Sequence, residues 1–155
     1  MSRSIVSRRR TVGIVLALFL AGPGVAQAPD EFSGRLSWVP ISGAQRANVG
    51  GSGAVSGSLA RSALEINGTF ESLPSPAISA SLREGVATGA RGPVIAELSV
   101  TRNNSGTISG EVRLSRAQLT ALRAGRLYVQ LHAENGVEPD NAVLWGWLLA
   151  EETSR

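Results

Sequence analysis

The stretch LEINGTFE, Leu64 to Glu71, alternates apolar and polar side chains almost without interruption. In an extended chain, Leu64, Ile66 and Phe70 fall on one face, and the polar residues between them fall on the other. A period of two residues is typical of a β-strand with one face buried and the other in solvent. The stretch therefore predicts a strand. Where the same pattern recurs along the chain, it predicts further strands and so determines the fold class.

The strand pattern recurs along most of the chain. Further strand-like runs lie at residues 32–39, 53–60, 94–100, 107–114, 127–133 and 142–150. Turn sequences rich in glycine, asparagine and serine separate several of these runs. About seven to nine short strands with such turns are typical of a β-sandwich or a small barrel. We predict an all-β fold, built as an antiparallel, Greek-key-like β-sandwich.

One short helix is expected at about residues 115–124. Ser115 and Gln118 stand three residues apart, the spacing of a capping box, in which each side chain bonds the backbone amide of the other. Leu119 and Leu122 supply an apolar stripe, and Gly125 is placed to end the helix in a left-handed conformation. The helix interrupts the strands and leaves the fold class unchanged.

The N-terminal residues have the architecture of a secretory signal. Arginines precede the uncharged run TVGIVLALFLAG at residues 11–22, and small residues follow it. A membrane span needs about 20 apolar residues, so this run is too short to be one. We predict a signal peptide at residues 1–28, cleaved after Ala26 or Ala28, and a single domain at residues 29–155. The protein is then exported, to the periplasm or the medium, with no membrane span after signal removal.

Composition excludes several classes of function. Four of the 15 basic residues precede the apolar run and all 12 acidic residues follow it, so the chain beyond the signal has a net charge of about −1. Its arginines are scattered, whereas a nucleic-acid surface needs a clustered basic face. The chain has no cysteine, which excludes disulfides and thiolate metal sites. Its stability must come from an apolar core.

A family resemblance becomes visible in the segment LSRAQLTALRAGRLYVQLHAE, residues 114–134. It resembles the chordin-type (CHRD) domain, whose hallmark is Leu-x-x-Gly-x-x-Tyr-Val-Asn-Val-His. Matches to the hallmark are Leu122, Gly125, Tyr128, Val129 and His132, with Gln130 and Leu131 as mild replacements. Similar runs near residues 32–39 and 68–70 extend the resemblance over the chain beyond the signal. It implies a bacterial, secreted member of the family with one domain.

The stretch ASLREGVATGARGP, residues 80–93, departs from the family pattern. CHRD domains usually carry Ala-His-Ile-His-x-Gly here, followed by Gly-Pro, and the two histidines fall on Ser81 and Arg83 of this chain. The resemblance thus implies a loop scaffold that has lost its His-x-His pair. On this interpretation the glycines of the loop matter for backbone shape, whereas Ser81 and Arg83 matter little.

His132 is the single histidine, and alternation places it on one strand face with Tyr128 and Gln130. Together with Ser81 and Arg83, these residues form our candidate functional surface. His132 could transfer protons or bind a metal, or it could be a hydrogen-bonded strand histidine that positions a neighbouring loop. We favour the second interpretation.

No metal site, cofactor or catalytic residue is predicted. A zinc or copper site needs three or four nitrogen, sulfur or oxygen ligands, and we interpret the nearby acidic residues, Glu134, Glu138 and Asp140, as a solvated loop. The nucleophile motif Gly-x-Ser-x-Gly is absent. Glu65 and Glu71 are too far apart on one strand to act as an acid–base pair. The protein is therefore expected not to be an enzyme.

The tryptophans are the residues best suited to hold a ligand by stacking. Trp145 and Trp147 share a strand face, and Trp38 lies on another strand. Exposed, the pair would make a platform for a sugar ring or a protein partner. Because Val143 and Leu149 extend the same row, we favour a core position for both.

Two classes of function remain. The first, which we favour, is a non-catalytic, exported β-sandwich, monomeric, that binds an unknown protein or another component of the cell envelope, or serves a structural role there. The second is a metal-binding or degenerate superoxide-dismutase-like redox domain of the periplasm. Only the family's usual His-x-His pair suggests the second class.

Overall fold

The computed structural model describes residues 30–151, which form nine strands, one α-helix and one 3-10 helix. The predicted signal peptide lies outside the described residues. The elements in chain order are β1 (Asp30–Trp38), η1 (Gly43–Asn48), β2 (Ser52–Ala60), β3 (Ala63–Glu71), β4 (Ala77–Glu84), β5 (Val94–Val100), β6 (Gly106–Arg113), α1 (Arg116–Arg123), β7 (Leu127–Val137), β8 (Ala142–Trp147) and β9 (Leu149–Ala150). Within this part of the chain, no helix is long and apolar enough to cross a membrane. The all-β fold class is confirmed.

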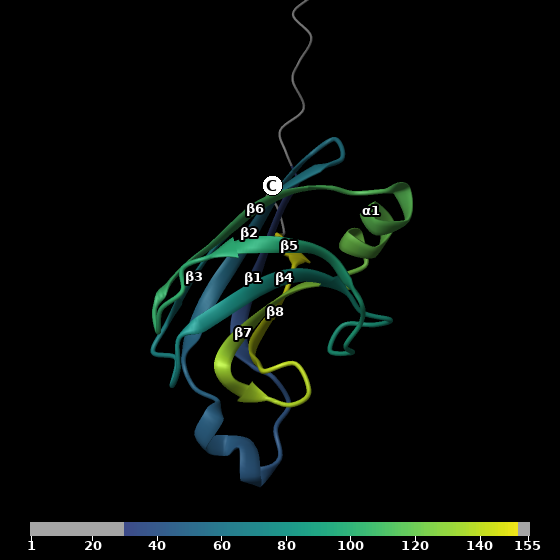
Figure 1. The fold of residues 1–155 in the computed structure, drawn as a ribbon. Helices are drawn as coiled ribbons and strands as arrows, with labels where there is room; N and C mark the ends of the chain where they lie inside the picture. Colours follow the sequence, from purple (N-terminus) through teal and green to yellow (C-terminus); the bar gives the residue numbers. More distant parts are fainter. Residues whose placement is uncertain (1–29, 152–155) are drawn as a thin grey trace, which may run out of the picture.

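The sheet closes on itself into an antiparallel barrel. Its strand order is β2-β3-β6-β5-β4-β7-β8-β1, and β1 also pairs with β2, so eight strands of the described chain complete the circle (Figure 1). The short strand β9 adds to β1 alongside β8. Strands β4, β5 and β6 form a meander with β3 beside β6, which is a Greek-key order.

The predicted architecture is therefore wrong in one respect: the sheet is closed into a barrel, whereas the sheets of a sandwich have open edges. The reason lies in β1, which pairs with β2 over residues 30–36 and with β8 at residues 37 and 38. One strand thus joins the two edges that would stay open in a sandwich. Alternating side chains cannot distinguish the two architectures, because both have one buried face and one solvent face.

The main apolar core fills the inside of the barrel. Leu64 and Ile66 of the quoted stretch are fully buried, Phe70 is nearly so, and Glu65 between them is exposed. A second, smaller cluster lies on the outside of β7 and β8, where the segment containing η1 covers it. Its buried members are Val39, Val49, Tyr128, Val137, Ala142 and Trp145.

The helix is confirmed with its predicted cap. The backbone amide of Gln118 donates to Ser115 Oγ at 3.2 Å, and the amide of Ser115 donates to Gln118 Oε1 at 2.8 Å. Gly125 follows the helix with a φ of +67°. The chain can therefore turn directly from α1 into β7, the strand that carries most of the candidate surface.

The predicted row of apolar residues in β8 is interrupted. A shift in the register between β7 and β8 places Val143 in the core inside the barrel, whereas Trp145 and Trp147 lie in the outer cluster. Leu149, at the other end of the row, is 49% exposed. Trp145 is buried, as favoured, but outside the barrel rather than in its main core.

Candidate functional site

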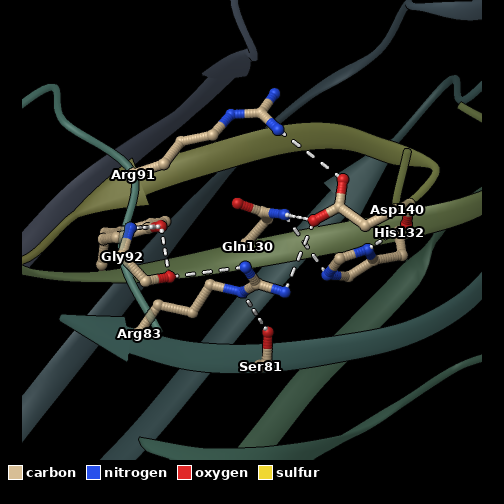
Figure 2. Close-up of polar contacts among 8 residues, drawn as sticks. Ser81, Arg83, Arg91, Gly92, Gln130, His132 and Asp140 are labelled. Carbon is tan, nitrogen blue, oxygen red and sulfur yellow. Dashed lines mark hydrogen bonds and ion pairs between the residues drawn. The ribbon is translucent and has the colours of Figure 1, made fainter. Parts of the chain in front are cut away.

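The five residues of the candidate surface lie together on the outside of the barrel. Strands β4 and β7 are antiparallel neighbours, with Ser81 opposite Gln130 and Arg83 opposite Tyr128. His132 follows Gln130 on the same face of β7, because every second residue of a strand points the same way. Figure 2 shows Ser81 and Arg83 from one strand and Gln130 and His132 from the other, with their side chains close together. We call this cluster, with Arg91 and Asp140, the β4–β7 site.

Asp140 is the centre of the site, and sequence reasoning missed its role. It lies in the connection between β7 and β8, and its carboxylate accepts a hydrogen bond of 3.0 Å from Gln130 Nε2. Its Oδ2 lies 3.5 Å from Arg83 Nη2, and its Oδ1 lies 3.6 Å from Arg91 Nη1. The interpretation of this acidic run as solvated holds for Glu134 and Glu138, which are exposed, and is wrong for Asp140. Only the folded chain brings the two arginines to this loop.

The contacts of His132 define its neutral tautomer. Nδ1 lies 2.7 Å from the backbone carbonyl oxygen of Asp140, so Nδ1 carries the proton and donates it. The Gln130 amide must donate to the Asp140 carboxylate, so its nitrogen faces His132 Nε2, at 3.5 Å, which is then the acceptor. His132 is buried and tied to a loop, as the structural interpretation of this residue predicts.

Arg83 is not the replaceable surface residue that we expected from the sequence. Its side chain is 16% exposed, and its Nε donates to Ser81 Oγ at 3.1 Å. Its Nη1 contacts the carbonyl oxygen of Gly92 at 3.5 Å, and Ser81 itself is buried. The two positions onto which the resemblance places the family's histidines therefore hold a polar network of their own, and these contacts do not fit the expectation that Ser81 and Arg83 matter little.

The loop between β4 and β5 folds back over the aromatic residues of β7 and β8. The amide of Gly92 donates to the hydroxyl of Tyr128 at 2.9 Å. A Cβ added at Gly92 would collide with the carbonyl group of Glu84, and one at Gly85 would lie 2.8 Å from Trp147 Cη2. Close approach, rather than a positive φ, requires glycine at these two positions.

Tyr128, Trp145 and Trp147 form an aromatic trio beneath that loop. The ring centroids of Tyr128 and Trp147 are 4.4 Å apart, and those of the two tryptophans are 5.6 Å apart at an interplanar angle of 69°. Trp145 is only 9% exposed, and Trp147 is partly buried and packs against the same cluster, so the pair is a packed support rather than an open platform. Trp38 is exposed, and its indole nitrogen donates to the carbonyl oxygen of Gly51 at 3.0 Å.

Two buried atoms of the site lack hydrogen bonds. They are Gln130 Oε1 and Asp140 Oδ1, although the latter also faces the Arg91 guanidinium. Leaving a buried acceptor unpaired costs about 1–3 kcal/mol. The site therefore has capacity to accept hydrogen bonds from a group that is not part of the network.

A separate hollow of about 950 Å³ lies on the other side of the barrel, over β1, β2, β3 and β6. It exists because the outward side chains there are short, among them Ser56, Thr69 and Thr107. Arg35 is its one charged lining residue, and its other polar side chains are serine and threonine hydroxyls and the amide of Asn67. The chemistry of the molecule is concentrated at the β4–β7 site instead.

Metal binding has little support in the donors of the described chain. Residues 30–151 contain no group of three or more His, Cys, Asp and Glu side chains placed to hold a metal ion. At the β4–β7 site, the two positions of the family's histidine pair hold a hydroxyl and a guanidinium. The guanidinium of Arg83 carries a positive charge and cannot be a ligand.

The fold and the site together define a class of protein: an all-β barrel domain with a hydrogen-bonded polar network on its outer face. The family model of the CHRD domain matches residues 39–138, and the chain belongs to this family. No curated protein and no solved structure matches the chain.

The matched segment does not contain the whole barrel. It begins after β1 and ends before β8, so it excludes two of the strands that close the circle. It includes Arg83, Gln130 and His132 but ends two residues before Asp140. The family resemblance is thus confirmed for residues 39–138, and the residue that joins the site together lies outside that segment.

Proposed function

We propose that this protein is an exported, non-catalytic domain that binds a component of the cell envelope through the β4–β7 site. The observation that carries the proposal is the convergence of Arg83, Arg91 and Gln130 on one carboxylate at the surface of a rigid barrel. Such fixed donors are suited to recognition. Membership of the CHRD family agrees with a β-domain that acts by binding.

The chemistry of the site argues against catalysis. A nucleophile needs an adjacent general base, and both ring nitrogens of His132 are engaged by Asp140 and Gln130. The site has two hydroxyls: Ser81 Oγ accepts a hydrogen bond from Arg83, and the hydroxyl of Tyr128 is bonded to the backbone of Gly92, so neither is paired with a general base. Recognition by arginine and amide donors needs neither a nucleophile nor a general base.

Export is proposed from the signal-like sequence before the barrel. Expression in a bacterium, followed by intact-mass measurement of protein recovered from the periplasm or medium, tests it. We expect the loss of the residues through Ala26 or Ala28. Full-length protein in the cytosol, with Met1 or Ser2 at its terminus, would refute export.

Binding is tested by cosedimentation of the purified protein with isolated envelope fractions. We expect the wild-type protein to sediment and Arg91→Ala to remain largely in solution. Arg102→Ala is the matched control, because Arg102 is an exposed arginine of another loop. Equal sedimentation of all three proteins, or none, contradicts recognition through this site.

Metal analysis distinguishes the second class of function. Purified protein is dialysed and its copper and zinc contents are measured. We expect less than stoichiometric amounts of both metals. A stoichiometric metal that survives dialysis would favour a metal-binding or redox domain over the proposal.

A further inference from the structure

The donors of the β4–β7 site form a receptor for a carboxylate. Arg83 comes from β4, Arg91 from the loop after it and Gln130 from β7, and all three face the carboxylate of Asp140. Two guanidinium groups and one amide on a single carboxylate is the arrangement by which proteins recognise acidic ligands. Here the receptor is occupied by a side chain of the same protein.

Asp140 fills this receptor poorly. Its ion-pair distances of 3.5 and 3.6 Å exceed the 2.7–2.9 Å that is typical of charge-assisted hydrogen bonds. Its Oδ1 accepts no hydrogen bond although it is buried. The carboxylate of a free ligand can therefore approach the two guanidinium groups more closely than a side chain that is attached to this loop.

Gln130 provides an independent indication of a ligand. The side chain is fully buried, and its Oε1 has no hydrogen-bond donor. In Figure 2 the amide nitrogen points to Asp140 and the oxygen points to the opposite side. A ligand that satisfied this oxygen would need a hydrogen-bond donor, such as a hydroxyl, beside its carboxylate.

We propose that Asp140 is an internal occupant of a binding site for hydroxy acids of the uronic-acid type, and that such a ligand displaces its side chain. The ligand carboxylate takes the place of Asp140 against Arg83 and Arg91, and a ligand hydroxyl donates to Gln130 Oε1. This inference rests on the proposed binding function and names the chemistry of the partner.

Displacement of Asp140 is physically accessible. Its side chain is 30% exposed, so rotation into solvent does not leave a buried charge. Its backbone carbonyl can stay bound to His132, because only the side chain has to move. The ligand carboxylate then supplies the negative charge against Arg83 and Arg91 that Asp140 supplies in the unbound protein.

The test measures binding of galacturonate, of galactose as its neutral counterpart, and of acetate. The reporters are calorimetry and the intrinsic tryptophan fluorescence, to which Trp145, paired with Gln130 across β7 and β8, contributes together with Trp38 and Trp147. We expect Asp140→Ala to bind galacturonate at least about tenfold more tightly than the wild-type protein, because the internal competitor is gone. Galactose should not bind, and acetate should bind more weakly than galacturonate.

Matched variants make the test specific. Glu138→Ala removes an exposed carboxylate from the same loop and should bind as the wild-type protein does. Adding Arg83→Ala to Asp140→Ala should abolish galacturonate binding. Where Asp140→Ala does not fold, Asp140→Asn keeps the size of the side chain, removes the charge and serves in the same titration.

Absence of galacturonate binding in folded Asp140 variants and in the wild-type protein overturns the inference. Equal binding of galactose and galacturonate overturns it as well, because the carboxylate then plays no part. If the wild-type protein sediments with envelope fractions but binds no carboxylate, the further inference fails while the proposed binding function stands.

Discussion

The inside of the barrel and the outer face of β4 and β7 are built on different principles. Inside, apolar residues from every second position of each strand meet their neighbours, and the pattern is visible in any one strand. Outside, the β4–β7 site depends on Asp140 and Arg91, which come from two loops. The comparison shows that local periodicity determines the core, whereas contacts distant in sequence determine the site.

The largest expected effect is a loss of core volume. Leu64→Ala removes a fully buried side chain from the centre of the barrel, and we expect unfolding to require about 2–5 kcal/mol less free energy. The neighbouring Glu65→Ala points outward and should change stability by less than about 0.5 kcal/mol. Chemical denaturation of both proteins makes the comparison, and similar losses would mean that β3 has no buried face.

In the loop over the aromatic trio, the substitution of one glycine should lower the free energy of unfolding almost as much as Leu64→Ala. Gly92→Ala forces a Cβ against the backbone of Glu84, and we expect a cost of about 2–3 kcal/mol. Gly89→Ala is the control: Gly89 has a φ of +85° but open space around it, so strain alone should cost about 1 kcal/mol. Thermal melts that reverse this order would contradict the described packing of the loop.

Arg83 tests whether the outer face is a network or a remnant. Arg83→Ala removes the guanidinium from Asp140, Ser81 and the carbonyl group of Gly92, and should destabilise the protein by about 1–2 kcal/mol. The exposed Arg102→Ala should stay within about 0.5 kcal/mol. Equal midpoints in denaturant would restore the interpretation that position 83 matters little.

The smallest of these effects concerns the hydroxyl of Tyr128. Tyr128→Phe keeps the aromatic trio but removes the hydrogen bond to the amide of Gly92, at a cost of about 1 kcal/mol. Amide hydrogen exchange should become faster in residues 85–93 and remain unchanged in β3. Uniformly faster exchange would show that the hydroxyl supports the whole barrel rather than the loop.

The sequence predicted those features that depend on neighbours along the chain. Alternation at Leu64–Glu71 located β3, and the spacing of Ser115 and Gln118 located α1 with its cap. The family pattern grouped the five candidate residues, but residues 80–93 were interpreted as a loop, whereas Ser81 and Arg83 lie on β4, opposite Gln130 and Tyr128 of β7. The CHRD family assignment followed from the same stretches.

Features that arise from distant pairing were not predictable. Closure of the barrel depends on β1 pairing at both of its sides, which no periodicity records. The register shift that moves Val143 inside also leaves no pattern in a uniformly apolar strand. Asp140 looked like one of several loop acids, because its partners Arg83 and Arg91 lie about fifty residues earlier in the chain.

A double-mutant cycle on Arg83→Ala and Asp140→Ala tests most directly whether the outer face is organised around Asp140. The free energies of unfolding of the wild-type, single-mutant and double-mutant proteins give the interaction energy of the pair. We predict a coupling of about 1 kcal/mol, and almost none in the matched cycle on the exposed pair Arg123 and Asp30. Additivity within about 0.3 kcal/mol for Arg83 and Asp140 would contradict the account, because the two residues would then not belong to one network.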